Sequence, residues 1–397
     1  MKVGEFAKFA YVQIDLDPFT GWGNYGKQLC QHLVSEGIAF PLTPCDGSVT
    51  GSCELPWVWL VSEIYKRSNG VLSSFLPEMS VESGLYDFAF EPFGNEFLPR
   101  PLLGRFNVAT GFFEKSTFSA DEISFLRGFD LVVTGSSWNR SVLRRHGIPG
   151  VKFVMQGVDT SRFNPSPTPR VLQSPFIVFS GGKLEIRKGQ DIVIAAFREF
   201  LKICPEALMI CCWSVAEGFS QAFDDSVHVD CVSDLESRAD VKKWIVQNGI
   251  PEDNFILVDH LSAAQIPSLI KQADVAVFPN RCEGGTNLVA MEALCCGLPV
   301  LLSACNGHLD LMRMGFGNLI PLRSASCVSH VSRMSDFYGA DPLVVWGECS
   351  VGEIIEKFRG LCEAKGYGNS LRWPVPDHIL GGMSWENSFK KFFKYLK

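Results

Sequence analysis

The sequence predicts an α/β protein built from two doubly wound domains. Short apolar runs, typical of buried strands, alternate with helical stretches along the whole chain. In the first half these runs are 9–14, 57–61, 88–90, 106–109, 131–134 and 152–155, and in the second half they are 176–180, 208–213, 255–257, 275–278, 300–303 and 318–321. Because the two halves are alike, we expect two parallel sheets that face each other across a cleft, which is where ligands of such sheets bind.

The length and a proline-rich segment locate the domains. A chain of 397 residues is long enough for two or three domains of roughly 150 residues each. The segment 165–169, Pro-Ser-Pro-Thr-Pro, is too rich in proline for a helix or a central strand and is typical of a stiff linker. We therefore expect an N-terminal domain over 1–168, a C-terminal domain over 169–380 and a final helix within 381–397, where aromatic side chains recur at the spacing of one helical face.

The composition excludes several classes of protein. A net charge of −7 and a pI near 5.6 argue against nucleic acid as a partner, although a few local cations suffice for a phosphorylated ligand. No apolar run is long enough to span a bilayer, and the first residues lack the pattern of a secretory signal. The fourteen cysteines and seven histidines lack metal-binding spacing. We expect reduced core thiols and a cytoplasmic protein without an integral membrane segment.

An anion site is predicted in the second half of the chain. The apolar run 274–278 leads through the Gly-Gly-Thr turn 284–286 into a helix that ends at Gly297. The first backbone N–H groups of a helix have no internal partner, and the helix dipole favours negative charge at this end. We therefore expect the N–H groups of residues 287–289 to bind a phosphate.

One carboxylate, Glu292, lies inside this otherwise apolar helix, one turn beyond Leu288. Residues at i and i+4 share a helix face, so Glu292 is expected about 5.4 Å further along the face on which the phosphate would bind. That offset matches the step from a diphosphate to the ribose hydroxyls of a nucleotide. The alternative is a helix carboxylate that pairs with a lysine.

A second phosphate-binding segment is predicted upstream, over 176–191. It combines a strand, the turn Gly181-Gly182, a loop with three cations and a helix over about 190–203. The cations are Lys183, Arg187 and Lys188. Cations in a loop more often belong to a solvated surface, but a glycine-rich helix start in the same half of the chain favours a phosphate site.

These segments resemble the donor-sugar motifs of retaining glycosyltransferases of the GT-B fold, called group 1 or family 4. The family's pattern is glutamate, seven residues, glutamate, whereas eight residues separate Glu283 from Glu292 here. Either the loop carries one extra residue or Gly284 fills the first position. The segment 155–165 also resembles the end of the family's N-terminal domain, and the likeness covers roughly 130–397.

The resemblance implies two Rossmann-like domains and a C-terminal helix that crosses back to the first domain. It also implies transfer of a sugar from a nucleoside-diphosphate sugar, such as a UDP- or GDP-sugar, with retention of anomeric configuration. The acceptor is then a glycan, a lipid-linked molecule, a protein or a small molecule. By resemblance Lys183, Lys188 and Glu283 are catalytic, and no metal or other cofactor is needed. The residues assigned to the donor are Gly21, Gly23, Gly182, Arg187, His260, Gly284, Gly285, Thr286, Asn287, Leu288, Val289 and Glu292.

The N-terminal half contains a motif with a competing interpretation. Residues 21–26, Gly-Trp-Gly-Asn-Tyr-Gly, match the dinucleotide pattern of NAD-binding oxidoreductases, with Asp46 twenty residues after Gly26. That pattern needs its first glycine at the end of a strand, and six residues separate Gly21 from the preceding apolar run. Gly21 and Gly23 instead resemble the family's glycine-rich loop over the donor. A non-catalytic nucleotide-sugar-binding protein and a nucleotide-sugar isomerase of the same fold remain alternatives.

Three further residues are weaker candidates. Glu114 follows a strand that ends at the expected cleft, and Ser137 lies where a strand gives way to a helix, so both are candidates for contact with the acceptor. A surface carboxylate and a helix cap are the respective alternatives. The resemblance places His260 at the nucleobase, with an ordinary loop histidine as the alternative.

Overall fold

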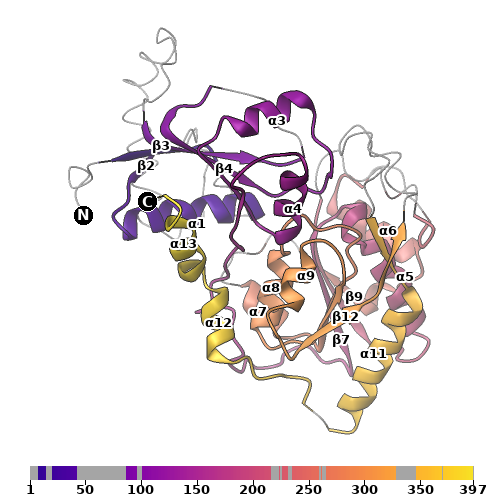
Figure 1. The fold of residues 1–397 in the computed structure, drawn as a ribbon. Coiled ribbons are helices and arrows are strands. Elements are labelled where there is room, and N and C mark those ends of the chain that lie inside the picture. Colours follow the sequence, from indigo (N-terminus) through magenta and orange to yellow (C-terminus); the bar gives the residue numbers. More distant parts are fainter. Residues whose placement is uncertain are drawn as a thin grey trace. The chain divides into compact units, whose positions relative to one another are not determined.

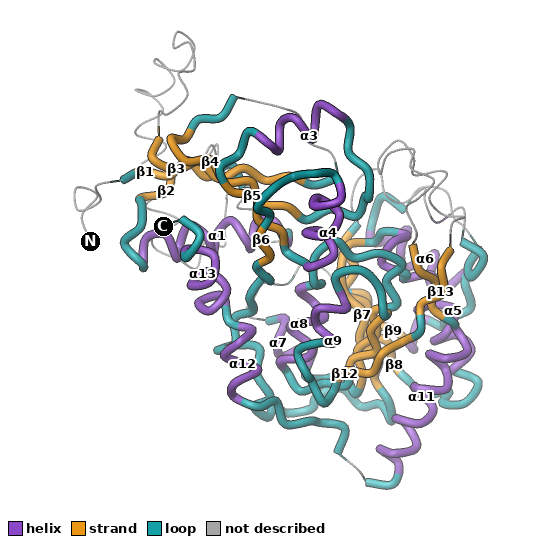
Figure 2. Tube along the Cα trace, in the orientation of Figure 1, coloured by secondary structure: helices purple, strands orange, loops and turns teal. Residues whose placement is uncertain are grey.

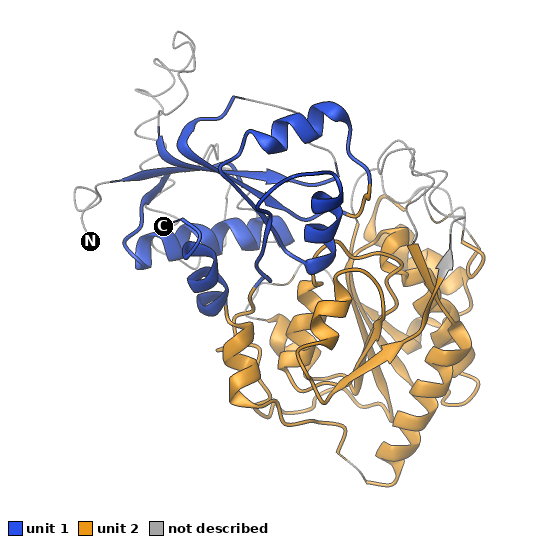
Figure 3. Cartoon of the chain, viewed as in Figure 1, with its two compact units in different colours: residues 1–113, 117–156, 385–397 blue, residues 114–116, 157–384 orange. Residues whose placement is uncertain are grey.

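The structure is a computed structural model of the chain. It describes residues 8–14, 20–42, 86–95, 101–215, 223, 226–230, 235–258, 261, 265–327, 346–368 and 370–396. The chain divides into two compact units (Figure 3). Unit 1 comprises 1–113, 117–156 and 385–397, and unit 2 comprises 114–116 and 157–384.

Unit 1 is built on a parallel six-stranded sheet with the order β2-β1-β3-β4-β5-β6. The strands are β1 (Phe9–Val12), β2 (Phe40–Leu42), β3 (Tyr86–Phe93), β4 (Gly104–Gly111), β5 (Leu131–Thr134) and β6 (Lys152–Phe153). The described helices are α1 (Gly21–Ser35), α3 (Ala120–Arg127), α4 (Ser137–Arg145) and α13 (Trp385–Phe393) (Figure 1). The strands predicted in the first half are confirmed, apart from 57–61, which lies outside the described residues; β2 is not among the predicted runs.

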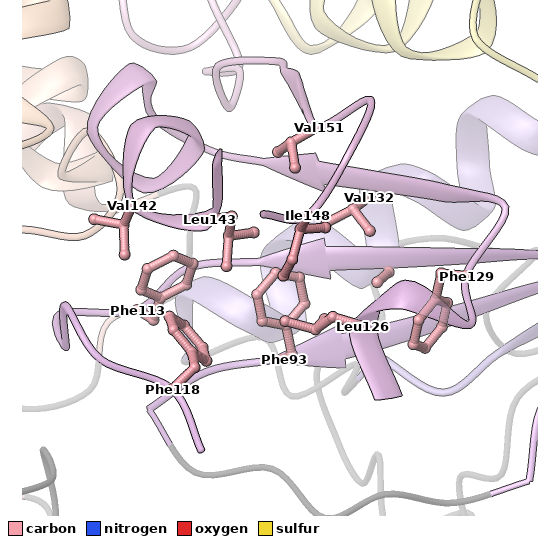
Figure 4. Packing of buried hydrophobic residues seen from close by; sticks show 11 residues of the cluster. Phe93, Phe113, Phe118, Leu126, Phe129, Val132, Val142, Leu143, Ile148 and Val151 are labelled. Atoms are coloured by element: carbon pink, nitrogen blue, oxygen red, sulfur yellow. The ribbon is translucent and has the colours of Figure 1, made fainter. Parts of the chain in front are cut away.

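A cluster of buried apolar side chains joins β3 and β4 to α3 and α4 (Figure 4). The ring of Phe113 stacks on that of Phe93 at 5.7 Å between centroids and meets the edge of Phe118 at 5.0 Å. The other members are Ala109, Leu126, Phe129, Val132, Val142, Leu143, Ile148 and Val151. The side-chain amide of Asn139 in α4 donates to the carbonyl oxygen of Phe113 at 2.7 Å. The packing and this hydrogen bond hold Phe113, the residue before Glu114, in place.

The C-terminal helix α13 belongs to unit 1, as the sequence predicts. The ring of Phe389 lies 5.5 Å from that of Tyr25 and 5.0 Å from that of His32, both in α1. The ring of Phe392 lies 6.1 Å from that of Phe90 in β3. These contacts join the end of the chain, yellow in Figure 1, to its beginning, which is indigo.

Unit 2 contains a second parallel six-stranded sheet, with the order β12-β11-β10-β7-β8-β9. The strands are β7 (Ile177–Lys183), β8 (Leu208–Ser214), β9 (Phe255–Leu257), β10 (Val275–Phe278), β11 (Val300–Ser303) and β12 (Leu319–Leu322), and a separate antiparallel pair is formed by β13 (Ser324–Cys327) and β14 (Trp346–Cys349). All six strands predicted in the second half are confirmed.

The connections in unit 2 are mostly helical, as Figure 2 shows. The α-helices are α5 (Gln190–Phe200), α6 (Arg238–Gln247), α7 (Ile266–Ile270), α8 (Leu288–Cys295), α9 (His308–Met312), α11 (Val351–Gly366) and α12 (Asp377–Met383), and the short 3-10 turns are η2 (Ile186–Lys188) and η4 (Glu252–Asn254). The helix predicted over about 190–203 is α5, which ends at Phe200. The helix predicted to follow the Gly-Gly-Thr turn is α8.

The proline-rich segment groups with unit 2, so the division between the units falls at residue 157 rather than near 169. Arg170 accounts for part of this difference, because its guanidinium donates to both carboxylate oxygens of Asp274 at 2.7 and 3.0 Å. The side-chain amide of Gln272 donates to the carbonyl oxygen of Pro169 at 2.9 Å. These bonds fasten the segment to the start of β10.

Two further observations concern the state of the cysteines and the length of the helices. The ten cysteines whose side chains are described are all free, and most of them are buried. Within the described ranges, no helix is both long enough and apolar enough to cross a bilayer.

Candidate active site

The strand order of unit 2 indicates where a ligand binds. From β7 the chain moves to β8 and β9 on one side, and it then returns to β10, β11 and β12 on the other side. In open parallel sheets the ligand crevice lies at the carboxyl ends of the two strands where the order reverses. The predicted cationic loop follows β7, and the predicted glycine-rich turn follows β10. The fold therefore brings the two predicted phosphate-binding segments together.

The end of β7 and the loop that follows it each contain one glycine with a positive φ. Gly182 has a φ of 124°, which other residues rarely adopt, and open space lies where a Cβ would be. Gly189 has a φ of 73°, and a Cβ there would lie 2.5 Å from the carbonyl oxygen of Pro279, just beyond β10. Because only glycine permits this approach, the cationic loop 183–188 can dock against the end of β10.

The loop after β10 leads into α8, whose N-terminus offers free donors. Asn287 caps the helix, because its side-chain oxygen accepts a hydrogen bond from the N–H of Ala290 at 3.3 Å. In the described part of the chain, the N–H groups of Leu288 and Val289 have no acceptor. Two free donors at the positive end of the helix dipole suit a phosphate, as the sequence predicts.

The Gly-Gly-Thr turn is held in shape by its neighbours. The backbone N–H of Gly307, from the loop after β11, donates to the carbonyl oxygen of Glu283 at 3.0 Å. A Cβ on Gly307 would overlap the carbonyl oxygen of Gly285. The hydroxyl of Thr286 is buried and lies 3.0 Å from the sulfur of Met291. Close packing on both sides leaves the turn little freedom.

The carboxylate of Glu283 lies at the centre of a network of donors. Its Oε2 accepts from the ammonium of Lys188 at 2.5 Å and from the side-chain amide of Asn280 at 2.8 Å, and the guanidinium of Arg187 lies 3.5 Å away. Burial raises the pKa of Glu283, but Lys188 and Arg187 outweigh burial and bring this pKa to about 2. Glu283 is therefore ionised at neutral pH.

Glu114 lies against the same loops. Its Oε1 is 3.2 Å from Nη1 of Arg187 and accepts from the backbone N–H of Gly284 at 3.4 Å. Nε of Arg187 also lies 2.5 Å from the carboxylate of Glu185. Residues 114–116 group with unit 2, although they lie within the range 1–168 expected for the N-terminal domain. The contact of Glu114 with an acceptor stays a prediction.

Lys183 and Glu292 differ from these paired charges. Lys183 is exposed, and its ammonium forms no ion pair with any described residue. Glu292 is half-buried and has no hydrogen bond or ion pair from its carboxyl group in the described ranges, so the alternative of a pairing lysine finds no support. Burial raises the pKa of Glu292 to about 8. A partially buried carboxyl group without a partner is costly, which indicates a group kept for a ligand.

A comparison with protein-family models points to the same loops of unit 2. Residues 166–329 match the family model described as glycosyl transferases group 1, and this range includes the loops after β7, β10 and β11. Residues 166–329 form a group 1 glycosyltransferase domain. The resemblance inferred from the sequence motifs is thereby confirmed.

Solved structures of similar fold extend over almost the whole chain. Sucrose-phosphate synthase from Thermosynechococcus elongatus has a TM-score of 0.55 and 16% identity, with 97% of this chain and 99% of that chain covered. HepE of Anabaena, in complex with UDP and glucose, has a TM-score of 0.63 and 14% identity, with 98% and 99% covered. A glycosyltransferase from Rickettsia africae has a TM-score of 0.53 and 13% identity, with 99% and 100% covered.

These structures confirm the predicted GT-B fold. The glycosyltransferase activity is indicated by the family match over residues 166–329. No curated protein sequence matches the chain.

Arg281, which the sequence analysis does not single out, organises the loops of the glycosyltransferase site. Its side chain is fully buried, and all five N–H groups of its guanidinium are used. Asp191 accepts two of them at 2.8 and 2.7 Å, Glu348 accepts two at 2.6 and 3.1 Å, and the carbonyl oxygen of Ile186 accepts the fifth at 2.6 Å. The backbone N–H of Arg281 donates to the carbonyl oxygen of Arg187 at 2.7 Å. One residue thus connects the loop after β10, the cationic loop, α5 and β14.

The two carboxylates around Arg281 are ionised for physical reasons. Burial raises the pKa of Asp191, but the charge and hydrogen bonds of Arg281 outweigh burial, and this pKa lies below its usual value. The pKa of Glu348 is also lowered, because His228 and Arg281 outweigh burial. One feature of the sequence could have revealed Arg281. This residue lies between a buried strand and the glycine-rich turn, and an arginine buried there needs partners of opposite charge because an unpaired buried charge is unfavourable.

The remaining predicted residues lie in unit 1 or outside the described ranges. Gly21 and Gly23 lie in the first turn of α1, where the Thr20 hydroxyl accepts from the N–H of Gly23 at 2.8 Å, so the expectation of a loop at these two glycines is wrong. Their role at the donor stays a prediction. Ser137 is the first residue of α4, and Ser136 is the cap. His260 and Asp46 lie outside the described residues.

Arg281→Met is expected to destabilise the protein by about 3–5 kcal/mol, because it leaves the fully buried Asp191 without its cation and removes one of the partners of the partly buried Glu348. Urea denaturation followed by circular dichroism measures the change. The control is Arg105→Met, which removes an exposed partner of Asp87, and it should cost less than about 1 kcal/mol. Equal effects of the two substitutions would contradict the organising role of Arg281.

Proposed function

We propose that this glycosyltransferase transfers a sugar from a nucleoside-diphosphate sugar, with UDP as the nucleotide, to a hydroxyl group of an acceptor, with retention at the anomeric carbon. The observation that carries the proposal is the unpaired carboxyl group of Glu292, one helical turn beyond the free N–H groups of Leu288 and Val289. This spacing suits the ribose and the diphosphate of one nucleotide. The complex of HepE with UDP and glucose supports the choice of UDP.

The proposed reaction is driven by stabilisation of the leaving diphosphate. As the bond between the anomeric carbon and the phosphate oxygen breaks, negative charge grows on the diphosphate. Lys183, Lys188 and the start of α8 stand at the end of the sheet where this charge would form, and one preorganised donor of this kind is worth about 3 kcal/mol. The acceptor oxygen forms the new bond to the anomeric carbon, and its proton passes to the departing diphosphate.

Glu283 has a supporting role in this scheme. One oxygen, Oε2, is engaged by Lys188 and Asn280, whereas Oε1 has no partner within the described residues. Because the carboxylate is ionised, Oε1 can accept a hydrogen bond from a hydroxyl of the donor sugar. Glu283 and Lys188 would then orient the sugar and the diphosphate relative to each other.

We further propose that the enzyme acts in the cytoplasm, which the free state of the described cysteines supports.

A thermal-shift screen against UDP-, GDP- and ADP-sugars tests the choice of nucleotide, because a ligand at 100 times its dissociation constant stabilises a protein by about 2.7 kcal/mol. Stabilisation by UDP-sugars above the others supports the proposal. The absence of any shift would contradict a nucleotide-sugar donor.

Donor affinity should fall as the pH falls from 9 to 7. The pKa of Glu292 is about 8 without ligand, and ribose hydroxyls bind the ionised form, so about nine-tenths of the protein must lose a proton at pH 7 before it binds. Calorimetry with UDP-glucose should show roughly tenfold weaker binding at pH 7 than at pH 9.

Glu292→Gln is the matched control for this titration. It should lower the affinity at pH 9 by about 1.5–3 kcal/mol, through loss of a charge-assisted hydrogen bond, and it should remove the dependence on pH. A pH profile that Glu292→Gln leaves unchanged would take Glu292 out of the donor site.

Lys188→Ala is expected to reduce turnover more than Arg187→Ala. The ammonium of Lys188 pairs with Glu283, beside the start of α8, whereas the guanidinium of Arg187 is also held by Glu185 and Glu114. Loss of a cation that acts on the leaving group costs ~10²-fold or more in kcat. Steady-state rates with saturating acceptor decide between the two, and a larger loss at Arg187 would transfer the phosphate contact to the arginine.

Transfer should proceed without a divalent metal or another cofactor, because Lys183, Lys188 and the helix N-terminus supply the positive charge that the diphosphate needs. The rate in excess EDTA should equal the rate in magnesium or manganese. If EDTA abolishes transfer and either metal restores it, the proposed charge balance is incorrect.

A further inference from the structure

Three buried polar side chains contact one another at the N-terminus of α8. Asn287 is the cap of that helix, His308 is the first residue of α9, and Ser303 ends β11. Ser303 and His308 are fully buried, and Asn287 is nearly so. A buried polar group is stable only if it has a hydrogen-bond partner. The hydrogen bonds among these three side chains therefore fix their orientations.

The backbone of Asn287 has an unusual conformation. Its φ of 62° lies in the left-handed region, where asparagine is among the few residues tolerated. Its side-chain oxygen accepts from the N–H of Ala290 at 3.3 Å. The cap uses the third N–H of α8 and leaves those of Leu288 and Val289 for a ligand. The direction of these two free groups therefore depends on how Asn287 is held.

His308 holds the other end of the Asn287 amide. Nδ1 of His308 lies 3.1 Å from the carbonyl oxygen of Ser303 and 3.0 Å from its hydroxyl. A carbonyl oxygen only accepts, so we assign the ring hydrogen to Nδ1. Burial lowers the pKa of His308 to about 4, so the ring is neutral and Nε2 keeps its lone pair. Nε2 then accepts from the Asn287 amide nitrogen at 3.3 Å.

This assignment fixes the amide in one orientation. With the nitrogen turned to His308, the oxygen of Asn287 faces the N–H of Ala290, as a cap requires. In the flipped orientation, oxygen would face the lone pair of Nε2, and nitrogen would face an N–H group. Both contacts would then be repulsive.

We propose that His308 is a positioning residue for donor binding, which acts through Asn287 to aim the N–H groups of Leu288 and Val289 at the diphosphate. The inference rests on the proposed function, since it gives that site its preorganisation. His308 itself does not touch the donor. Ser303 contributes by fixing which nitrogen of the ring carries hydrogen.

A double-mutant cycle with UDP as the probe tests the proposal. His308→Phe removes the acceptor while keeping a ring, and Asn287→Gly removes the amide while tolerating the positive φ. Each should weaken UDP binding about tenfold, as expected for one lost hydrogen bond. In the Asn287→Gly background, His308→Phe should have no further effect. His308→Gln, which restores an acceptor, should recover part of the affinity.

Asn318→Ala is the matched control for general destabilisation. The Asn318 side-chain amide is buried at the other end of α8, where it donates to the carbonyl oxygens of Leu294 and Leu298 at 3.0 and 2.7 Å. This substitution should lower the melting temperature and leave UDP affinity unchanged. A purely structural role for His308 would make His308→Phe behave in the same way, or weaken UDP equally in both backgrounds, and either result overturns the proposal.

Two outcomes separate this inference from the function on which it rests. Failure of the unmodified chain to bind UDP would overturn the choice of nucleotide in the proposed function. Binding by the unmodified chain together with unchanged affinity in His308→Phe would overturn the positioning role alone. Should His308→Phe not fold, Asn287→Gly carries the test, and unchanged UDP affinity in that variant overturns the proposal.

Discussion

The buried guanidinium of Arg281 is the interaction on which the site depends. Two carboxylates and a backbone carbonyl oxygen satisfy all of its N–H groups, and these acceptors belong to α5, β14 and the turn η2. A buried ion pair of this kind adds little net stability over an apolar cluster, but loss of one member is costly. Its effect is to specify one arrangement of the loops that leave β7 and β10.

The ionisable side chains of the site fall into two classes. Glu283, Lys188 and Arg187 compensate one another, so their side chains are held in place before a ligand arrives. Lys183 and Glu292 have no such compensation in the described part of the chain. A site that holds Glu283, Lys188 and Arg187 in place before the donor arrives can bind a diphosphate and a polar sugar ring with little movement of these side chains.

Much of this could be predicted from local sequence, and the exceptions have physical reasons. Each strand of the parallel sheet of unit 2 coincides with an apolar run, and Glu292 follows Leu288 at helical spacing, so the sheet and this residue could be predicted from the sequence. The role of Arg281 could not be predicted in this way, because its partners Asp191 and Glu348 lie 90 and 67 residues away in the sequence. Gly21 was assigned to a loop through the resemblance to the family's glycine-rich loop, whereas the Thr20 cap allows α1 to start there. The relay of His308 through Asn287 depends on tautomer and backbone conformation, which no motif encodes.

The measurement that tests the central claim most directly is a crystal structure of the chain with bound UDP. The account predicts diphosphate oxygens within hydrogen-bond distance of the N–H groups of Leu288 and Val289 and of the ammonium of Lys183 or Lys188. It also predicts ribose hydroxyls on the carboxylate of Glu292. UDP bound elsewhere in the chain, with the start of α8 and Glu292 untouched, would contradict it.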